Sequence, residues 1–281
     1  MLVAMDLHQL LEHGPQSGDL SKELRTRLAA GADLEARAGA SHETPLHVAT
    51  RRHRTEAVEL LLEAGCELDG VTAGGKTAFA HALRRGFDEL AGILRGAGAC
   101  TDLDPADNLA VALTHGHLAE ARALLTEDPG LARTGNPEED RLLADLTGRA
   151  ATEPVALLLE HGADLAAPGL DLGTPLHQAA WFGQPANARL LLDAGAPLEV
   201  FEAFHGSSPL GWAVHGSRFS GGAAERASAY EEVTALLLAA GARLAYPDEQ
   251  PGPDAAYARR LLEDAAPGVR VLLEEHLART G

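Results

Sequence analysis

Histidines and cysteines are the residues of this 281-residue chain whose chemistry most readily serves catalysis or metal binding. Thirteen histidines and two cysteines are present, but their spacing matches no catalytic pattern. His115 and His117 are two residues apart, so on a helix they would point to different sides. The sequence has no GxSxG, HExxH or CxxC motif and no glycine-rich phosphate loop. We therefore expect no enzymatic activity, no metal and no cofactor.

Two pairs of arginines recur at the same position of a repeated motif, and their guanidinium groups could bind anions. Arg51 and Arg52, and again Arg84 and Arg85, stand seven and eight residues after a threonine that opens a recurring motif. Guanidinium groups grip carboxylates and phosphates, so four of them in a strip would form a basic contact surface. Alternatively they pair with acids of neighbouring segments, and the candidates are Glu67, Asp69, Asp102 and Asp104.

Aromatic residues gather in one part of the chain. Of the eleven in the sequence, six lie between positions 181 and 219. Trp181 and Phe182 again occupy the seventh and eighth positions after a threonine. Exposed, adjacent aromatics are typical anchors of protein interfaces. The alternative is that some of them fill gaps between structural units, most plausibly Trp212 and Phe219. The candidate partner-binding residues are Trp181, Phe182, Phe201, Phe204, His205, Trp212 and Phe219.

A repeated pair of helices must position these side chains. In the clearest copy, Thr174 and Pro175 predict an N-cap and a helix that begins at Pro175. Gly183 ends this short helix. A second helix carries three leucines at 190–192, and Gly195 supplies the left-handed residue that commonly follows a helix. Each copy thus consists of two helices followed by an extended segment.

The same pattern recurs along the chain at a nearly fixed interval. Successive closing glycines are 34, 33, 32, 32, 33 and 46 residues apart, at Gly31, Gly65, Gly98, Gly130, Gly162, Gly195 and Gly241. The TPLHxA sequence stands at 44–49 and 174–179, and LLxxGAD stands at 158–164. With this period and these motifs, the chain resembles the ankyrin-repeat family over residues 6–249.

The resemblance implies an all-α solenoid of paired antiparallel helices with short β-turn or hairpin exits. It also implies that His47 and His177 are structural, because the family uses this ring to bond backbone between repeats. The concave side, where partners usually bind, would carry the ends of the first helices and the exit fingers. The expected repeats lie near 6–40, 41–75, 76–106, 107–137, 138–170, 171–206 and 207–249.

The interval of 46 residues requires an insertion, which fits at 216–230. Its Gly, Ser and Ala content predicts a mobile loop, with a lengthened second helix from Ala223 onward as a further possibility. Residues 250–281 are expected to form a C-terminal helical cap, because an uncovered last repeat would expose its apolar side.

Charge and composition limit the partners and the location. The net charge of −18 argues against nucleic acid, since phosphate neutralisation needs a basic surface. The N-terminal stretch lacks the pattern of a signal peptide, and no window is apolar enough to span a membrane. We therefore expect a cytoplasmic protein that is a monomer and does not contact membranes. Only Lys22 and Lys76 are lysines, an arginine bias that points to a bacterial source.

The two cysteines are expected to be reduced and buried. Cys66 and Cys100 occupy similar places in successive repeats, about 10 Å apart, which is beyond disulfide reach.

Two functions remain on this basis. The first is a non-catalytic scaffold or adaptor that binds a partner protein, chiefly through the aromatic residues of repeats six and seven. The alternative is a regulator that holds a small anionic or phosphorylated ligand on the arginine strip of repeats two and three.

Overall fold

The computed structural model describes residues 6–14 and 18–280, so residues 15–17 of the expected first repeat and residue 281 of the expected cap lie outside it. The chain divides into two compact units, residues 1–120 (unit 1) and residues 121–281 (unit 2). Over the described residues the fold is helical and contains no strand, and an isolated antiparallel bridge joins Ala38 and Glu43. The predicted all-α solenoid is confirmed.

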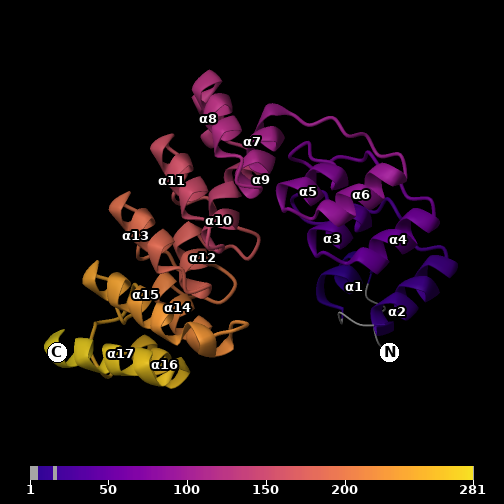
Figure 1. Cartoon of the computed structure of the whole chain (residues 1–281). Coiled ribbons are helices and arrows are strands. Elements are labelled where there is room, and N and C mark those ends of the chain that lie inside the picture. Colours follow the sequence, from indigo (N-terminus) through magenta and orange to yellow (C-terminus); the bar gives the residue numbers. More distant parts are fainter. Residues whose placement is uncertain (1–5, 15–17, 281) are drawn as a thin grey trace. The chain divides into compact units, whose positions relative to one another are not determined.

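Unit 1 is a stack of helix pairs in two rows. The first helices of successive pairs contact one another, and so do the second helices (Figure 1). The bounds in this unit are α1 Leu7–His13, α2 Gly18–Ala29, α3 Pro45–Arg51, α4 Thr55–Glu63, α5 Ala78–Arg84, α6 Asp88–Gly96, α7 Pro105–Thr114 and α8 Leu118–Glu127, which continues into unit 2.

Unit 2 repeats this arrangement. One row consists of α10, α12, α14 and α16 in successive contact, and the other of α11, α13, α15 and α17 (Figure 1). The bounds are η1 Pro129–Ala132, α9 Pro137–Asp140, α10 Leu142–Thr147, α11 Thr152–Glu160, α12 Pro175–Trp181, α13 Pro185–Asp193, α14 Pro209–Phe219, η2 Ala224–Arg226, α15 Ala227–Ala239, α16 Ala256–Asp264 and α17 Pro267–Thr280.

The predicted helix starts are confirmed where the threonine motif is intact. Helices α3 and α12 begin at Pro45 and Pro175, and the threonine before each proline forms a capping box with the histidine three residues later. In α14 the side chain of Ser208 accepts a hydrogen bond from the backbone N–H of Gly211, as expected for the threonine equivalent.

Two repeats that lack the threonine motif begin with other caps. Helix α7 starts at Pro105, with Asp104 as its cap. Before α9, the side chain of Asn136 accepts from the backbone N–H of Glu138 and caps the helix. In both places a short polar side chain before a proline is the start signal.

The motif histidines join neighbouring repeats, which confirms their predicted structural role. Nε2 of His47 lies 3.0 Å from the carbonyl oxygen of Lys76, and Nε2 of His177 lies 3.1 Å from that of Ser207. Burial lowers the pKa of His177 to about 4, although the bond to Ser207 acts in the opposite direction. The ring is therefore neutral at physiological pH and serves as a fixed link between repeats.

Apolar faces of the paired helices form the core of each unit. Leu7, Leu10 and Leu11 of α1 are buried, and so are Leu20 and Leu24 of α2. Each fully buried leucine stabilises the stack by roughly 2 kcal/mol. No helix of the described residues is long and apolar enough to cross a bilayer.

The prediction of a mobile loop at 216–230 is wrong, because most of this insertion is helical. Gly216–Phe219 extends α14, residues 224–226 form η2, and α15 begins at Ala227 rather than Ala223. The hydroxyl of Tyr230, which is fully buried, donates to the carbonyl oxygen of Trp181 at 2.7 Å. The insertion thereby supports the end of α12.

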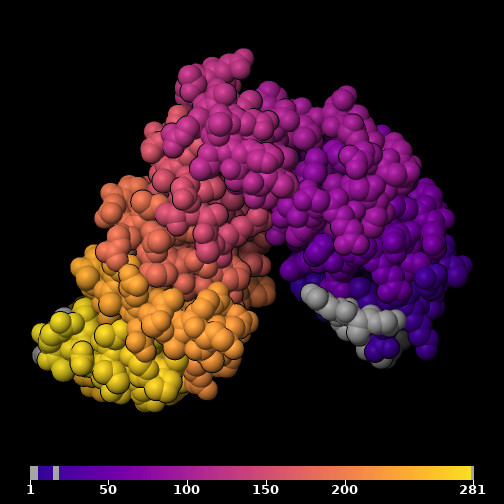
Figure 2. All heavy atoms as spheres, viewed as in Figure 1, coloured from indigo at the N-terminus to yellow at the C-terminus, as the bar shows by residue number. Residues whose placement is uncertain are grey.

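Helices α16 and α17 follow the last ankyrin-like pair. They contact α14 and α15 and cover the end of the stack, where Figure 2 shows them in yellow. The hydroxyl of Tyr257 accepts from the backbone N–H of Ser208 at 3.0 Å, so α16 contacts the cap of α14.

The cysteine prediction holds for one thiol. Cys66 is buried, and burial, followed by the charge of Glu35, raises its pKa to about 11. Cys100 is exposed, so its predicted burial is wrong. It directly follows the buried Ala99 in the segment after α6.

Candidate functional site

A cavity of about 290 Å³ in unit 2 brings several of the predicted residues together. Its aromatic walls are Trp181 at the end of α12, Trp212 and His215 on α14, and His205 on the segment before α14. We call it the aromatic cavity. The ring centroids of Trp181 and Trp212 are 6.0 Å apart at an interplanar angle of 72°, and Trp181 stacks on His215 at 5.8 Å and 25°. These are favourable edge and stacked geometries.

Charged residues complete the lining of the aromatic cavity. Asp171 comes from the exit segment before α12, whereas Arg260 and Asp264 come from α16. Nδ1 of His215 lies 3.4 Å from a carboxylate oxygen of Asp264. The guanidinium of Arg260 donates to the hydroxyl of Tyr246 at 3.1 Å.

Trp212 lines the cavity as a buried ring rather than as an exposed anchor. Its side chain is 7 % exposed, and its ring centroid lies 5.1 Å from that of His177. A Cβ atom at Gly173 would lie 2.7 Å from the Trp212 ring, so only glycine leaves room for it. The prediction that Trp212 is exposed is therefore wrong, and its alternative role as a gap filler describes it better.

Phe204 and His205 lie on a finger-like turn beside the cavity. The buried carboxylate of Glu202 accepts from the backbone N–H groups of both residues at 2.6–2.9 Å and shapes this turn. Burial alone would raise the pKa of Glu202, but these hydrogen bonds, together with the one from Trp212 and the charge of His205, lower it below its usual value. Phe204 is 78 % exposed, so the turn presents a large apolar ring to the outside.

The other predicted aromatics point elsewhere or only border the cavity. Phe219 is exposed and packs on His215, with ring centroids 4.3 Å apart. Phe201 instead packs against Tyr246 and Tyr257 at the cap. Phe182 is 37 % exposed and lies against Gly148. The structure thus groups Trp181, Phe204, His205, Trp212 and Phe219, and leaves Phe182 and Phe201 outside the group.

Several residues of the site were missed. His215 is the seventh residue after Ser208, so the same register that singled out Trp181 would have found it. Arg260 and Asp264 lie after the regular repeats, so no equivalent residue of another repeat could predict their positions. Leu172, next to Asp171, is exposed and has φ +62°, which is unusual for a bulky residue; this marks the turn as a second exposed finger.

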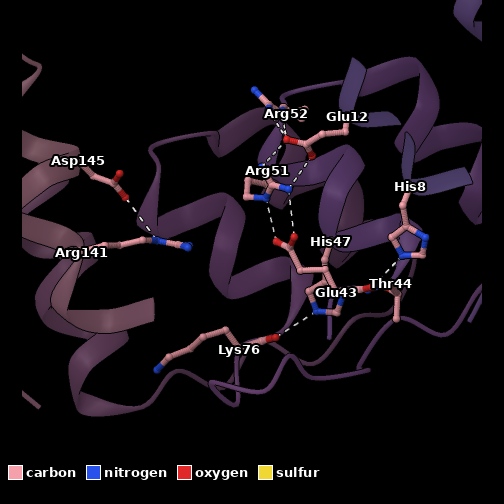
Figure 3. A network of polar contacts seen from close by, with 10 residues as sticks. All are labelled: His8, Glu12, Glu43, Thr44, His47, Arg51, Arg52, Lys76, Arg141 and Asp145. Carbon is pink, nitrogen blue, oxygen red and sulfur yellow. Dashed lines mark hydrogen bonds and ion pairs between the residues drawn. The ribbon is translucent and has the colours of Figure 1, made fainter. Parts of the chain in front are cut away.

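The first arginine pair is engaged within unit 1. Arg51 is 9 % exposed, and its guanidinium donates to Glu43 at 2.8 Å and to Glu12 at 2.7 Å (Figure 3). Arg52 also pairs with Glu12. Burial would raise the pKa of Glu12, but hydrogen bonds from Arg52 and Arg51 lower it to about 2.

The second pair is similarly occupied. Arg84 is 7 % exposed and donates to Asp107 at 2.9 Å, while Lys76, 1 % exposed, lies 3.1 Å from the same carboxylate. Arg85 lies 5.7 Å from the ring centroid of Phe87. The prediction of a strip of four open guanidinium groups is therefore wrong for Arg51 and Arg84. Pairing is the better description, although Glu12, Glu43 and Asp107 were not among the expected partners.

No group of three His, Cys, Asp or Glu side chains with metal-binding proximity occurs in residues 6–14 and 18–280. The side chains that line the described site are mostly aromatic and charged.

The stacked helix pairs and their histidine links define a helical repeat protein. A family model described as "Ankyrin repeats (3 copies)" matches residues 7–107, and one described as "Ankyrin repeat" matches residues 171–200. The chain is an ankyrin-repeat protein.

Individual relatives share the repeats over part of their length. The chain is 33% identical over 190 residues to human Ankyrin repeat and SOCS box protein 16, which covers 63% of this chain and 41% of that protein. It is 32% identical over 198 residues to the Probable E3 ubiquitin-protein ligase XBOS32 of Oryza sativa subsp. japonica, covering 67% and 38%. The chain thus spans less than half the length of either relative.

Among solved structures, the human ASB11 ankyrin repeat domain is 25% identical to this chain. The match covers 84% of this chain and 97% of that one, with a TM-score of 0.37.

Proposed function

We propose that this chain is a non-catalytic scaffold that binds a partner protein through the aromatic cavity of unit 2 and the Phe204 finger beside it. The observation that carries the proposal is an open cavity walled by two tryptophans, next to a phenylalanine that is 78 % exposed. Apolar rings exposed in this way are costly on a free surface and are typical of interface hot spots.

The arrangement of the rings supports a specific surface. The carbonyl of Trp181 is held by Tyr230, and Trp212 is fixed between Gly173 and His177. Rings fixed before binding lose little rotamer entropy when a partner docks. Phe204 also stands on a turn that the Glu202 carboxylate holds through backbone N–H groups.

The remaining properties belong to the same proposal. We take residues 6–249 as the repeat domain and residues 250–281 as its cap, in a monomeric, cytoplasmic protein of bacterial origin that binds neither nucleic acid nor membrane. The net charge of −18 supports the exclusion of nucleic acid.

Affinity capture with the full chain tests this function. Trp181→Ala and Phe204→Ala should each weaken capture of the partner by about 2 kcal/mol or more, with the fold retained. Phe182→Ala is the matched control, because this ring is also exposed but lies outside the group. Equal recovery of the same partner by all four proteins would exclude this surface.

A further inference from the structure

The aromatic cavity is small for a ligand site and has room for one large side chain. Its volume of about 290 Å³ lies at the lower limit of small-molecule sites, which usually measure about 300–1,000 Å³. A partner protein would therefore fill it with one residue while its neighbours contact the Phe204 finger. This step rests on the proposed function.

The charges around the cavity favour a cation. Asp171 and Asp264 line it, and the carboxylate of Glu202 lies next to the lining, with an oxygen 3.5 Å from Nε1 of Trp212. Against these three carboxylates stand one guanidinium, that of Arg260, which already donates to Tyr246, and two imidazole rings. Nδ1 of His215 lies 3.4 Å from Asp264, and Nδ1 of His205 lies 3.3 Å from Glu202. Asp171 has no such neighbour among the lining residues. An anion would be repelled, and an apolar side chain would leave the lining carboxylates desolvated.

The walls favour a planar cation. Tryptophan faces attract cations more strongly than other rings, and guanidinium groups stack on aromatic faces while their N–H groups pair with carboxylates. Asp171 and Asp264 enter the lining from different elements, the exit segment before α12 and helix α16. A guanidinium between them would therefore have an acceptor from each element.

We propose that the aromatic cavity binds an arginine side chain of the partner protein, stacked against Trp181 and paired with Asp171 and Asp264. The chain's net charge of −18 would also attract a basic partner segment over a longer range at low salt.

Intrinsic fluorescence can test this directly, because the only two tryptophans of the sequence both line the cavity. The full chain is titrated with N-acetyl-arginine amide and, in parallel, with N-acetyl-citrulline amide, which keeps the shape but lacks the charge. We expect a saturable change for the arginine probe at concentrations roughly tenfold lower than for the citrulline probe. Equal responses to the two probes would overturn the proposal.

Charge variants identify the acceptors. Asp171→Asn and Asp264→Asn should each weaken binding of the arginine probe by roughly two- to fivefold. Asp193→Asn is the matched control in unit 2, since Asp193 is exposed at the end of α13 and lies outside the cavity. Unchanged binding by both cavity variants would also overturn the proposal.

The two proposals can fail separately. If Trp181→Ala and Phe204→Ala lose the partner but the probes are indistinguishable, the surface stands and the arginine is excluded. If the arginine probe binds as expected but neither replacement affects the partner, the cavity is a guanidinium site and the proposed docking surface is wrong.

Discussion

The seventh residue after a helix cap has opposite surroundings in the two units. In unit 1 it is Arg51 or Arg84, and each guanidinium is buried against carboxylates. In unit 2 it is Trp181 or His215, and both rings line a cavity. Residues at the same position of different repeats therefore lie on the same side of their helices. Their neighbours determine whether they are accessible to a ligand.

The residue just before the cap accounts for part of this difference. Before Thr44 stands Glu43, whose carboxylate holds Arg51. Before Thr174 stands Gly173, where the missing side chain admits the ring of Trp212. In the repeat of Arg51 the preceding residue is thus its ion-pair partner, whereas in the repeat of Trp181 the preceding glycine leaves room for an aromatic ring.

The largest effect is expected from breaking the buried ion pairs of unit 1. Asp107→Ala would leave Arg84 and Lys76 buried without this carboxylate, and should lower the free energy of unfolding by about 3–5 kcal/mol. Urea unfolding followed by circular dichroism measures the loss. Asp102→Ala, an exposed acid of the same unit, is the control. Equal midpoints for the two variants would contradict the role given to the pairs.

A smaller effect is expected when the glycine of unit 2 is replaced. Gly173→Ala would place a Cβ atom 2.7 Å from the Trp212 ring and 2.8 Å from Cβ of His177, and should cost about 1–3 kcal/mol. It should also shift the tryptophan emission spectrum, because the ring must move. Gly221→Ala has no atom within 4 Å of its new Cβ and is the control. An unchanged spectrum and unchanged stability would show that Gly173 is not needed for the cavity.

Acid should weaken unit 1 through Glu12. Its pKa is about 2 in the folded chain against an ordinary 4.5, so its contribution is fully present above about pH 4.5 and disappears as the pH falls toward 2. Because the carboxylate is partly exposed, we expect a loss of about 1–2 kcal/mol. Urea unfolding at several pH values compares the chain with Glu12→Gln. The difference between the two should shrink over this interval, and a constant difference would contradict the assignment.

The smallest effect is expected from anions. Because Arg51 and Arg84 are already paired, inorganic phosphate at about 10 mM should leave the melting temperature unchanged. A thermal-shift series with phosphate, sulfate and citrate measures this. Stabilisation that disappears in Arg52→Ala would restore the alternative of an anion-binding regulator.

Local chemistry made much of the fold predictable. The caps at Thr44 and Thr174 and the histidine links depend on residues within one motif, so the sequence displays them directly. The ion pairs were less accessible, because Arg51 and Glu12 are 39 positions apart and belong to different repeats. The insertion was mistaken for a loop because glycine and serine at 216, 217 and 220 also tolerate an extended helix end.

Only the site residues that lie within the regular repeats could be predicted, because their positions follow from equivalent residues of other repeats. Register placed Trp181 correctly at the end of its helix and would have supplied His215. It carried no information on Arg260 and Asp264, which lie on α16 outside the regular repeats. It also could not show that Trp212 is covered, since that depends on the size of residue 173.

Lys76 is buried next to Asp104 and Asp107, and this affects how the protein can be labelled or immobilised through its amines. The sequence holds two lysines, and the other, Lys22, is exposed on α2. Among the lysines, amine-reactive dyes or biosensor chips should therefore couple almost exclusively to residue 22, which lies in unit 1, and the α-amino group is the other amine that reacts. Unit 2 contains no lysine, so its side chains would stay unmodified in binding measurements.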